Sequence, residues 1–322
     1  MSALLYTGKP MRKQKLLILV ILLCAVAAVG IIVYQRMARP PRAVLLLPEG
    51  NFVFYLNFSP AHFLDLGKIP AAESDPEYQD FLQQTGFHFE HDLNTLAVSQ
   101  GRPGDPDSES AAVFTGHFDQ ERLRNYLQKI SAGTEKYGDK TIFTVRRENH
   151  LVRACILDPE TVAITNMQSL EPMHIIIDKA RSSFPTAPSL VKNHYRDVPF
   201  ASLTWAMFHI SSEPTSQLPG DIKMDFLQNT TSVASLRYTG SIRFRLEVIS
   251  ASEANASNVT QSANTFLVLG RGAVESLNPS GPDKDVKEVF DSIQVQQNGN
   301  RTIVTVVIPQ NFVKKMSEAM NR

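Results

Sequence analysis

One uninterrupted apolar run stands apart from the hydrophobic pattern of the rest of the chain. Residues 16–34 read LLILVILLCAVAAVGIIVY, without a charged side chain. As a helix this run would extend roughly 28 Å, close to the hydrocarbon thickness of a bilayer. The alternatives are a buried core helix and a cleaved signal peptide, since Ala25-Val26-Ala27 resembles a cleavage site. The apolar residues continue to Tyr34, however, further than a signal peptide's apolar region extends, so the run predicts an uncleaved transmembrane helix.

The segments that flank this run favour one orientation. Four basic residues precede it and three follow it, which predicts a cytoplasmic leader over residues 1–15 by the positive-inside rule. A short leader and a large C-terminal body agree with that orientation. Residues 35–42 contain Arg39-Pro40-Pro41-Arg42, a stiff linker that would separate the body from the lipid. The body is therefore expected outside the cytoplasm.

Residues 43–190 alternate short apolar runs with amphipathic segments. Strands are predicted where apolar, β-branched or aromatic residues gather between turn residues, at Ala43–Leu47, Phe52–Phe58, Leu96–Val98, Ala112–Phe118, Ile142–Arg146, Leu151–Leu157 and Val162–Ile164. A helix is predicted after Asp119, a good N-cap residue, since Leu123, Leu127 and Ile130 share one helical face. Another is predicted over Asp75–Gln84.

Two further features complete this first half. Gly86 is expected to end the helix over residues 75–84, because glycine readily adopts the left-handed conformation that ends helices. Asn166 is expected to cap a helix that carries Leu170, Met173, Ile176 and Ile177.

Residues 191–322 repeat the same kinds of element. Strands are predicted at Phe200–Ile210, Ser232–Tyr238, Ile242–Val248, Ile293–Gln296 and Thr302–Ile308. Helices are predicted from Ser252, over Asp283–Phe290 and over Asn311–Met320. In the third of these strands apolar residues alternate with Arg243, Arg245 and Glu247, which are expected to face water. The sequence therefore predicts an α+β body in two parts, 43–190 and 191–322, each with antiparallel strands and helices.

Several stretches resemble one bacterial family. LLLPEGNFVFYLNF, FLQQTGFHFEHDLNTLAVSQ, VFTGHFDQERLRNYL and TIVTVVIPQNFVKKM are similar to segments of single-anchor envelope proteins of uncharacterised function. The resemblance covers most of the chain after residue 34, and its motifs are structural: Thr85-Gly86 and Asp92-Leu93 match, whereas His88 and His91 occupy variable positions. It implies a membrane-anchored α+β body on the periplasmic side of the inner membrane. It supplies no catalytic residue.

The stretch Phe87-His88-Phe89-Glu90-His91-Asp92 raises the question of a metal site. Its spacing matches neither His-Glu-x-x-His nor His-x-x-Glu-His, the arrangements that place metal ligands on one helical face. On a strand the two histidines would point to opposite sides. A connector with its aromatic side chains inside, and with Asp92 capping the next element of the chain, is favoured over a metal site completed by His117.

Other candidate residues have structural explanations. Cys155 lies in an apolar strand and is expected to be a buried thiol rather than a nucleophile. Trp205 is expected in the core rather than in a ligand platform. Arg146-Arg147 with Arg153 could bind an anion, but a solvated sheet face is favoured. Gly270-Arg271-Gly272 lacks the rest of a dinucleotide-binding motif. No catalytic, cofactor or metal residue is therefore assigned.

Composition excludes one class of partner and leaves three classes of function. Lysine plus arginine equals aspartate plus glutamate at 32 each, so no net field attracts nucleic acid. The favoured function is a non-catalytic anchored envelope protein that binds a protein or a cell-envelope component. The alternatives are an anchored hydrolase whose site is assembled from distant loops, and a carrier of an apolar ligand between the two halves.

Overall fold

The computed structural model describes residues 39–59, 76–101, 109–147, 150–211, 217–218, 222–223, 225–275, 282–310 and 312. Residues 41–322 form one compact unit, distinct from residues 1–40. The predicted transmembrane helix over residues 16–34 and the leader over residues 1–15 lie outside the described residues. Almost all of the helix predicted over residues 311–320 does too. Of the helices that the structure describes, none combines the length and the hydropathy needed to cross a bilayer.

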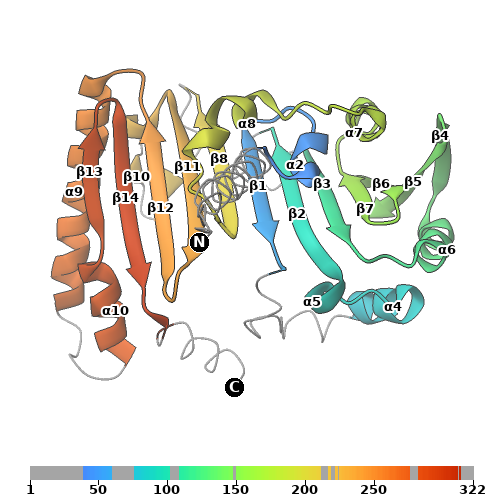
Figure 1. Cartoon of the computed structure of the whole chain (residues 1–322), viewed down its shortest axis with the longest axis horizontal. Coiled ribbons are helices and arrows are strands. Elements are labelled where there is room, and N and C mark those ends of the chain that lie inside the picture. The colour runs from blue at the N-terminus through green and yellow to red at the C-terminus, as the bar shows by residue number, and fades with distance from the viewer. Residues whose placement is uncertain are drawn as a thin grey trace, which may run out of the picture. The chain divides into compact units, whose positions relative to one another are not determined.

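The described residues form a sheet of twelve antiparallel strands with helices on both faces, which confirms the α+β class (Figure 1). Across the sheet the strands are β13 (Gln294–Asn298), β14 (Arg301–Ile308), β12 (Ile242–Ile249), β11 (Thr230–Tyr238), β8 (Thr204–Ile210), β1 (Phe52–Asn57), β2 (Leu93–Gln100), β3 (Ser110–Gly116), β7 (Thr161–Thr165), β6 (His150–Asp158), β5 (Lys140–Arg147) and β4 (Gly133–Tyr137). A separate hairpin consists of β9 (Gln217–Leu218) and β10 (Ile222–Lys223). All the sheet's strands except β4 were predicted from the sequence.

The chain follows a similar path twice through this sheet, with four returning strands (β4 to β7) in the first half and two (β13 and β14) in the second. In the first half, β1, β2 and β3 are neighbours, α6 (Gln120–Ile130) follows, and later strands return so that β7 pairs with β3. In the second half, β8, β11 and β12 are neighbours, α9 (Glu253–Glu275) and α10 (Pro282–Asp291) follow, and β14 returns to pair with β12. The halves meet where β1 pairs antiparallel with β8. The predicted boundary at residue 190 falls inside α8 (Ser189–His194).

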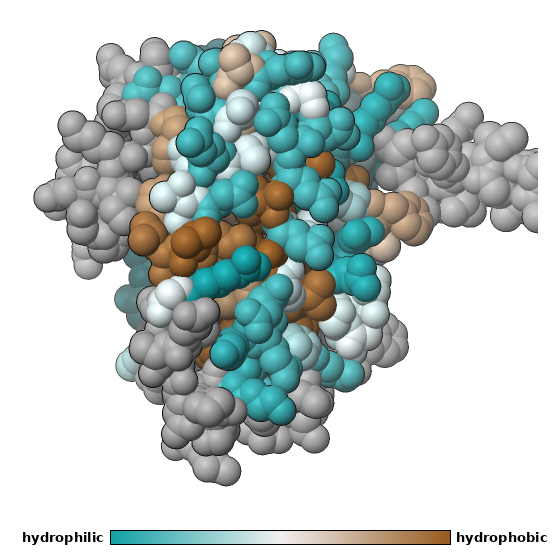
Figure 2. Space-filling view, turned by 90° about the vertical axis from the view of Figure 1, so that its left-hand side faces the viewer, coloured by the Kyte–Doolittle hydropathy of each residue, from teal (hydrophilic) through white to brown (hydrophobic). Residues whose placement is uncertain are grey.

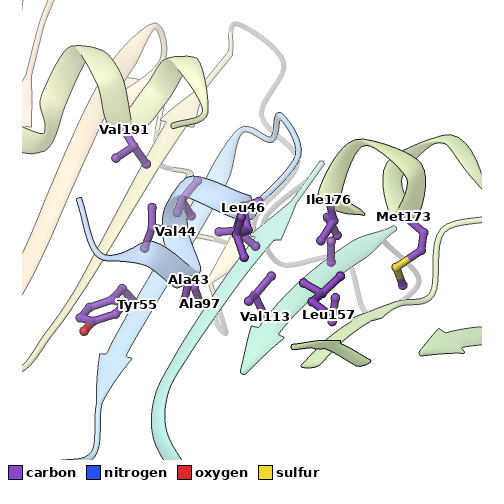
Figure 3. Close-up of a cluster of buried hydrophobic side chains, with 14 of the residues drawn as sticks. Ala43, Val44, Leu46, Tyr55, Ala97, Val113, Leu157, Met173, Ile176 and Val191 are labelled. Carbon is purple, nitrogen blue, oxygen red and sulfur yellow. The ribbon is translucent and has the colours of Figure 1, made fainter. Parts of the chain in front are cut away.

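The main core lies on one face of the sheet, which we call the core face. Its helices are α2 (Arg42–Leu46), α7 (Glu171–Arg181) and α8, whose Leu46, Ile176 and Val191 are buried against the strands (Figure 3). Tyr55 and Trp205 stack across the β1–β8 pair with ring centroids 5.6 Å apart. Trp205 is thus confirmed as a core residue that joins the two halves.

The other face, which we call the helix face, carries α6 at one end and α9 with α10 at the other. In β6 the side chains alternate, so Cys155 belongs to the core face and Ala154 packs with Leu123 and Leu127 of α6. At the far end Thr302 of β14 lies below α9 and donates to the carbonyl oxygen of Ala256 at 3.0 Å. Two separate helix layers therefore cover the ends of one face.

Two predicted elements differ from the structure. The predicted strand Ala43–Leu47 is instead the short helix α2, in which Val44 and Leu45 donate to the carbonyl oxygen of Pro41 at 3.0 and 3.1 Å. A five-residue apolar run has no readable period, so packing decided its conformation. The helix predicted after Asn166 begins only at Glu171. Asn166 Oδ1 instead accepts from the backbone N–H of Ser110 at 2.6 Å and fixes the end of β7 to β3.

Glu247, predicted to face water, is buried: its side chain is only 5% exposed. Its carboxylate accepts from Arg245 Nη2 at 2.6 Å and forms a short contact with Arg301. Arg301 Nη1 also donates to Asp197 Oδ1 at 2.7 Å, and Asp197 in turn pairs with His194. The two carboxylates raise the pKa of Arg301 above its ordinary value, Glu247 having the larger effect. Alternation placed Glu247 on the side opposite Val248, as expected, but Arg245 of β12 and Arg301 of β14 cover it there.

Candidate ligand pocket

A pocket on the helix face lies between the sheet and three helices of the first half. These are α4 (Pro76–Thr85), α5 (Phe89–Asp92) and α6, and the sheet contributes residues of β3, β5, β6 and β7. Local sequence fixes each wall. Gly86 has φ +69° and ends α4 as predicted, which turns Phe87 inward. The Asp119 carboxylate accepts from the backbone N–H groups of Glu121 and Arg122 at 3.1 Å, which confirms it as the N-cap of α6.

Six aromatic rings form the outer wall, and they are Tyr78, Phe81, Phe87, Phe89, Phe118 and Tyr126. The ring of Phe81 is central, with centroids 5.4 Å from Tyr126 and 5.9 Å from Phe89. Phe87 stacks on Phe118 at 4.8 Å. Edge-to-face and stacked contacts of this kind stabilise an aromatic cluster beyond its area burial. The rings therefore support one another.

The pocket has a volume of about 410 Å³. Aliphatic side chains of the sheet and of α6, including Val152, Val162 and Leu127, line its floor and inner wall. Glu77 and Arg147 are the charged residues among the described residues that line it, and they form a short ion pair with each other. Tyr78 donates to the Glu90 carboxylate at 3.4 Å. The interior is thus apolar and the polar groups lie at the rim.

Tyr126 adds a neutral hydroxyl to this rim. Burial raises the pKa of Tyr126 above its ordinary value, and the carboxylates of Asp80 and Glu77 raise it further, whereas Arg147 lowers it. The phenol is therefore protonated at neutral pH. It can donate a hydrogen bond to the polar end of a ligand without bringing a charge into the pocket.

The histidines that raised the question of a metal site lie beside this pocket. His88 and His91 are exposed, His88 preceding α5 and His91 within it. Asp92 was predicted to cap the element that follows it. Its Oδ2 instead accepts from the His88 backbone N–H at 2.7 Å, so the carboxylate supports the segment before it. Phe87 is buried, which confirms the aromatic side of the predicted connector. Among the described residues no group of three metal-ligating side chains comes together.

Cys155 and the arginines Arg146, Arg147 and Arg153 do not form one site. Cys155 is fully buried in the core, and burial raises the pKa of its thiol to about 11, which keeps it protonated. Arg153, expected on a solvated face, is instead buried and donates to the carbonyl oxygens of Met167 and Gln168. Arg153 thereby fixes the backbone of residues 167 and 168, which follow β7. Arg146 is exposed, and Arg147 lies at the pocket rim.

A second, polar groove of about 500 Å³ lies near the β1–β8 junction. Residues from both halves line it, including Glu49, Ser189, His194 and His209. The Glu49 carboxylate accepts from the backbone N–H and the hydroxyl of Ser189 at 2.8 and 3.2 Å, and so caps the start of α8. His209 Nδ1 lies 3.2 Å from the Thr231 hydroxyl. These contacts account for the polar groups as supports for α8 and the sheet.

Comparison with known proteins gives a limited result. The chain matches no protein-family model and no curated protein. Solved structures of TP0453 in crystal forms III, IV and I are similar to it, with TM-scores of 0.48, 0.47 and 0.46. Sequence identity is 9%, 9% and 10%, and the alignments cover 87%, 87% and 86% of this chain and 99%, 96% and 96% of the other.

Proposed function

We propose that the protein is a non-catalytic bacterial envelope protein, anchored through residues 16–34, whose body binds the apolar part of an envelope component in the aromatic pocket. The observation that carries this proposal is the pocket itself, a volume of about 410 Å³ lined by aromatic and aliphatic side chains. Ligand pockets generally measure about 300–1,000 Å³ and have mostly apolar walls with a few polar groups that orient the ligand.

Energetics favour an apolar ligand over a polar one. A ligand buried here would gain about 25 cal/mol for each Å² of apolar surface removed from water. A polar group placed against Phe81, Val152 or Val162 would lose its hydrogen bonds to water and find no partner, at a cost of several kcal/mol. The polar end of the ligand therefore lies at the rim, near Tyr126 and Arg147.

The same lining favours binding over catalysis. The described residues that line the pocket include no serine, cysteine or histidine, the side chains that most often supply nucleophiles and general bases. The pocket also lies inside the first half, whereas an apolar carrier was expected to hold its ligand between the halves. The proposed ligand is apolar, as in that alternative, but it lies within the first half and not between the halves.

Native mass spectrometry of the full chain released from bacterial membranes tests the pocket. Val152 is half-buried and lines it, so Val152→Trp should fill the space and remove a co-purifying apolar ligand. Leu151→Trp is the matched control, because Leu151 is the exposed neighbour on the opposite face of β6. Ligand mass retained equally in both variants, or absent from the unmodified chain, would contradict the proposal.

The orientation needs its own experiment. A reporter enzyme that is active only outside the cytoplasm, fused after Arg322, should be active in cells. Activity only from a cytoplasmic reporter at the same position would refute the proposed location and leave the pocket untouched.

A further inference from the structure

An exposed surface lies at the opposite end of the sheet from the pocket. It consists of the outer side of α9 and the outer edge of β13, and we call it the α9–β13 surface. Figure 2 shows this end of the molecule, where a hydrophobic patch lies among polar residues. Phe266, Val268 and Leu269 of α9 are 43%, 67% and 65% exposed. Large apolar side chains gathered on an exposed face mark an interaction site more often than scattered ones do.

Charge is absent from the middle of this surface and present at its two ends, where Arg271 Nη2 donates to the carbonyl oxygen of Ile293 at 3.2 Å and Glu253 lies beside Gly299. Residues 254–270, most of α9, contain no charged residue, and neither do residues 294–298 of β13. The described residues that line a groove of about 600 Å³ between the two are all uncharged, among them Gln261, Asn264, Leu269 and Gln297. Charged residues make up 20% of the chain, so this neutral surface departs from the rest of the molecule.

The edge strand itself is open to pairing. Among the described strands β13 has one neighbour, β14, so the backbone groups on its outer side face away from the sheet. Proteins commonly protect such edges with charged residues or proline, because an unprotected edge accepts another strand. The opposite edge strand, β4, carries Glu135 and Lys136, whereas β13 reads Gln-Val-Gln-Gln-Asn.

We propose that the α9–β13 surface binds a second copy of this chain, with the two β13 strands paired antiparallel. In a two-fold dimer the same surface meets itself, so a residue near the two-fold axis lies close to its own copy, and a charge there would face a like charge. A neutral surface avoids this repulsion. The paired strands would extend the sheet across the dimer, and Val268 and Leu269 of each copy would be covered beside the joined strands.

Disulfide cross-linking of the full chain in membranes tests this arrangement. Near the two-fold axis of an antiparallel pair, facing residues have Cα atoms about 4.5–5.5 Å apart, a separation that a disulfide can span. The exposed residues Gln294, Gln296 and Asn298 share one face of β13. In a Cys24→Ala background, where Cys155 remains buried, at least one of Gln294→Cys, Gln296→Cys and Asn298→Cys should give a covalent dimer under mild oxidation.

Two further variants complete the experiment. Lys136→Cys places a thiol on the opposite edge strand and should give at least tenfold less dimer. Leu269→Lys, an exposed change that the fold tolerates, should reduce the β13 cross-link at least tenfold by placing a charge on the surface. Absence of dimer from all three β13 variants, equal dimer from Lys136→Cys, or cross-linking to a different protein would overturn the proposal. A cross-link unaffected by Leu269→Lys would overturn the part assigned to α9.

Discussion

At one end of the sheet α6 lies on the helix face with α4 packed against it, and at the other end α9 lies on the same face with α10 beside it (Figure 1). The two ends direct their hydrophobic side chains differently. Phe81 of α4 turns toward Tyr126 and the sheet and helps to close a pocket, whereas Val268 and Leu269 of α9 face outward. The repeated chain path sets where the helices lie, and the residue pattern on each helix decides whether its apolar side chains close a pocket or face water.

The ion pairs differ between the ends in the opposite sense, with the exposed pair at the pocket end. At the second end Glu247 is 5% exposed and its partner Arg301 is 35% exposed, whereas Arg147 and Glu77 at the pocket rim are 54% and 66% exposed. Breaking a buried pair leaves an uncompensated charge, whereas water replaces an exposed one.

Arg301→Met should have the largest effect on stability. It leaves the buried Glu247 carboxylate with Arg245 as its remaining cation and leaves Asp197 with His194 alone. The free energy of unfolding should fall by about 3 kcal/mol, the size found when one partner of a buried pair is removed. Urea denaturation followed by the fluorescence of Trp205, the single tryptophan, measures it. A loss below about 1 kcal/mol would place this network with the exposed pairs.

Matched truncations of two phenylalanines compare the two helix layers directly. Phe81→Ala removes the central ring of the pocket wall and should lower the free energy of unfolding by about 2–3 kcal/mol, since the ring is half-buried. Phe266→Ala on α9 should cost less, about 1 kcal/mol, because that ring is 43% exposed and Phe226 is its neighbouring ring, with centroids 6.0 Å apart. Equal losses in the same urea experiment would mean that the α9 surface contributes to the fold rather than to a contact between molecules.

Alkaline pH should weaken the junction between the two halves. Burial raises the pKa of Tyr55 to about 12, so the folded chain keeps this proton more tightly than the unfolded chain, whose tyrosine pKa is about 10. The contribution of the protonated Tyr55 to the free energy of unfolding is complete below pH 10. It is lost as the pH rises toward 12, by at most about 1.4 kcal/mol per pH unit.

Tyr55→Phe should remove that part of the slope, measured as unfolding free energy against pH. Tyr126→Phe serves as the comparison at the pocket. Tyr126 is more exposed than Tyr55, so its removal should change the slope less. A slope that is the same in Tyr55→Phe and in the unmodified chain would contradict the assignment to the junction.

The smallest effect is expected at the pocket rim. Glu77→Gln removes the exposed pair with Arg147 and should change the free energy of unfolding by less than about 1 kcal/mol, with the difference decreasing at high salt. Unfolding at low and high ionic strength measures it. A loss as large as that of Arg301→Met would mean that the rim holds α4 in place.

Local patterns predicted most of the fold because most of its elements have local causes. Alternating apolar residues gave the strands, and Asp119 and Gly86 fixed helix ends through contacts within a few residues. The errors occurred where a distant partner decided. Asn166 is bound by Ser110, 56 residues away, and Glu247 is covered by Arg301, 54 residues away. Packing likewise made a helix of the run after Arg42.

The pocket could be predicted only in part. The inward position of Phe87 follows from the local pattern, and the density of phenylalanine between residues 81 and 89 was a signal that a ligand site was near. The remaining wall comes from α6, 45 residues beyond Phe81 at Tyr126, and the floor from β6 and β7. No local period shows that these segments meet, because the crossing of α4 over α6 depends on the whole sheet.

The position of β1 has a mechanical consequence. It is the first strand after residue 42, yet it lies at the middle of the sheet and is hydrogen-bonded along both sides, to β2 and to β8. A pull on the chain upstream of this strand is therefore resisted in shear by two ladders at once, instead of peeling an edge strand bond by bond. The anchor that we propose over residues 16–34 would apply tension at this strand, where two ladders resist it.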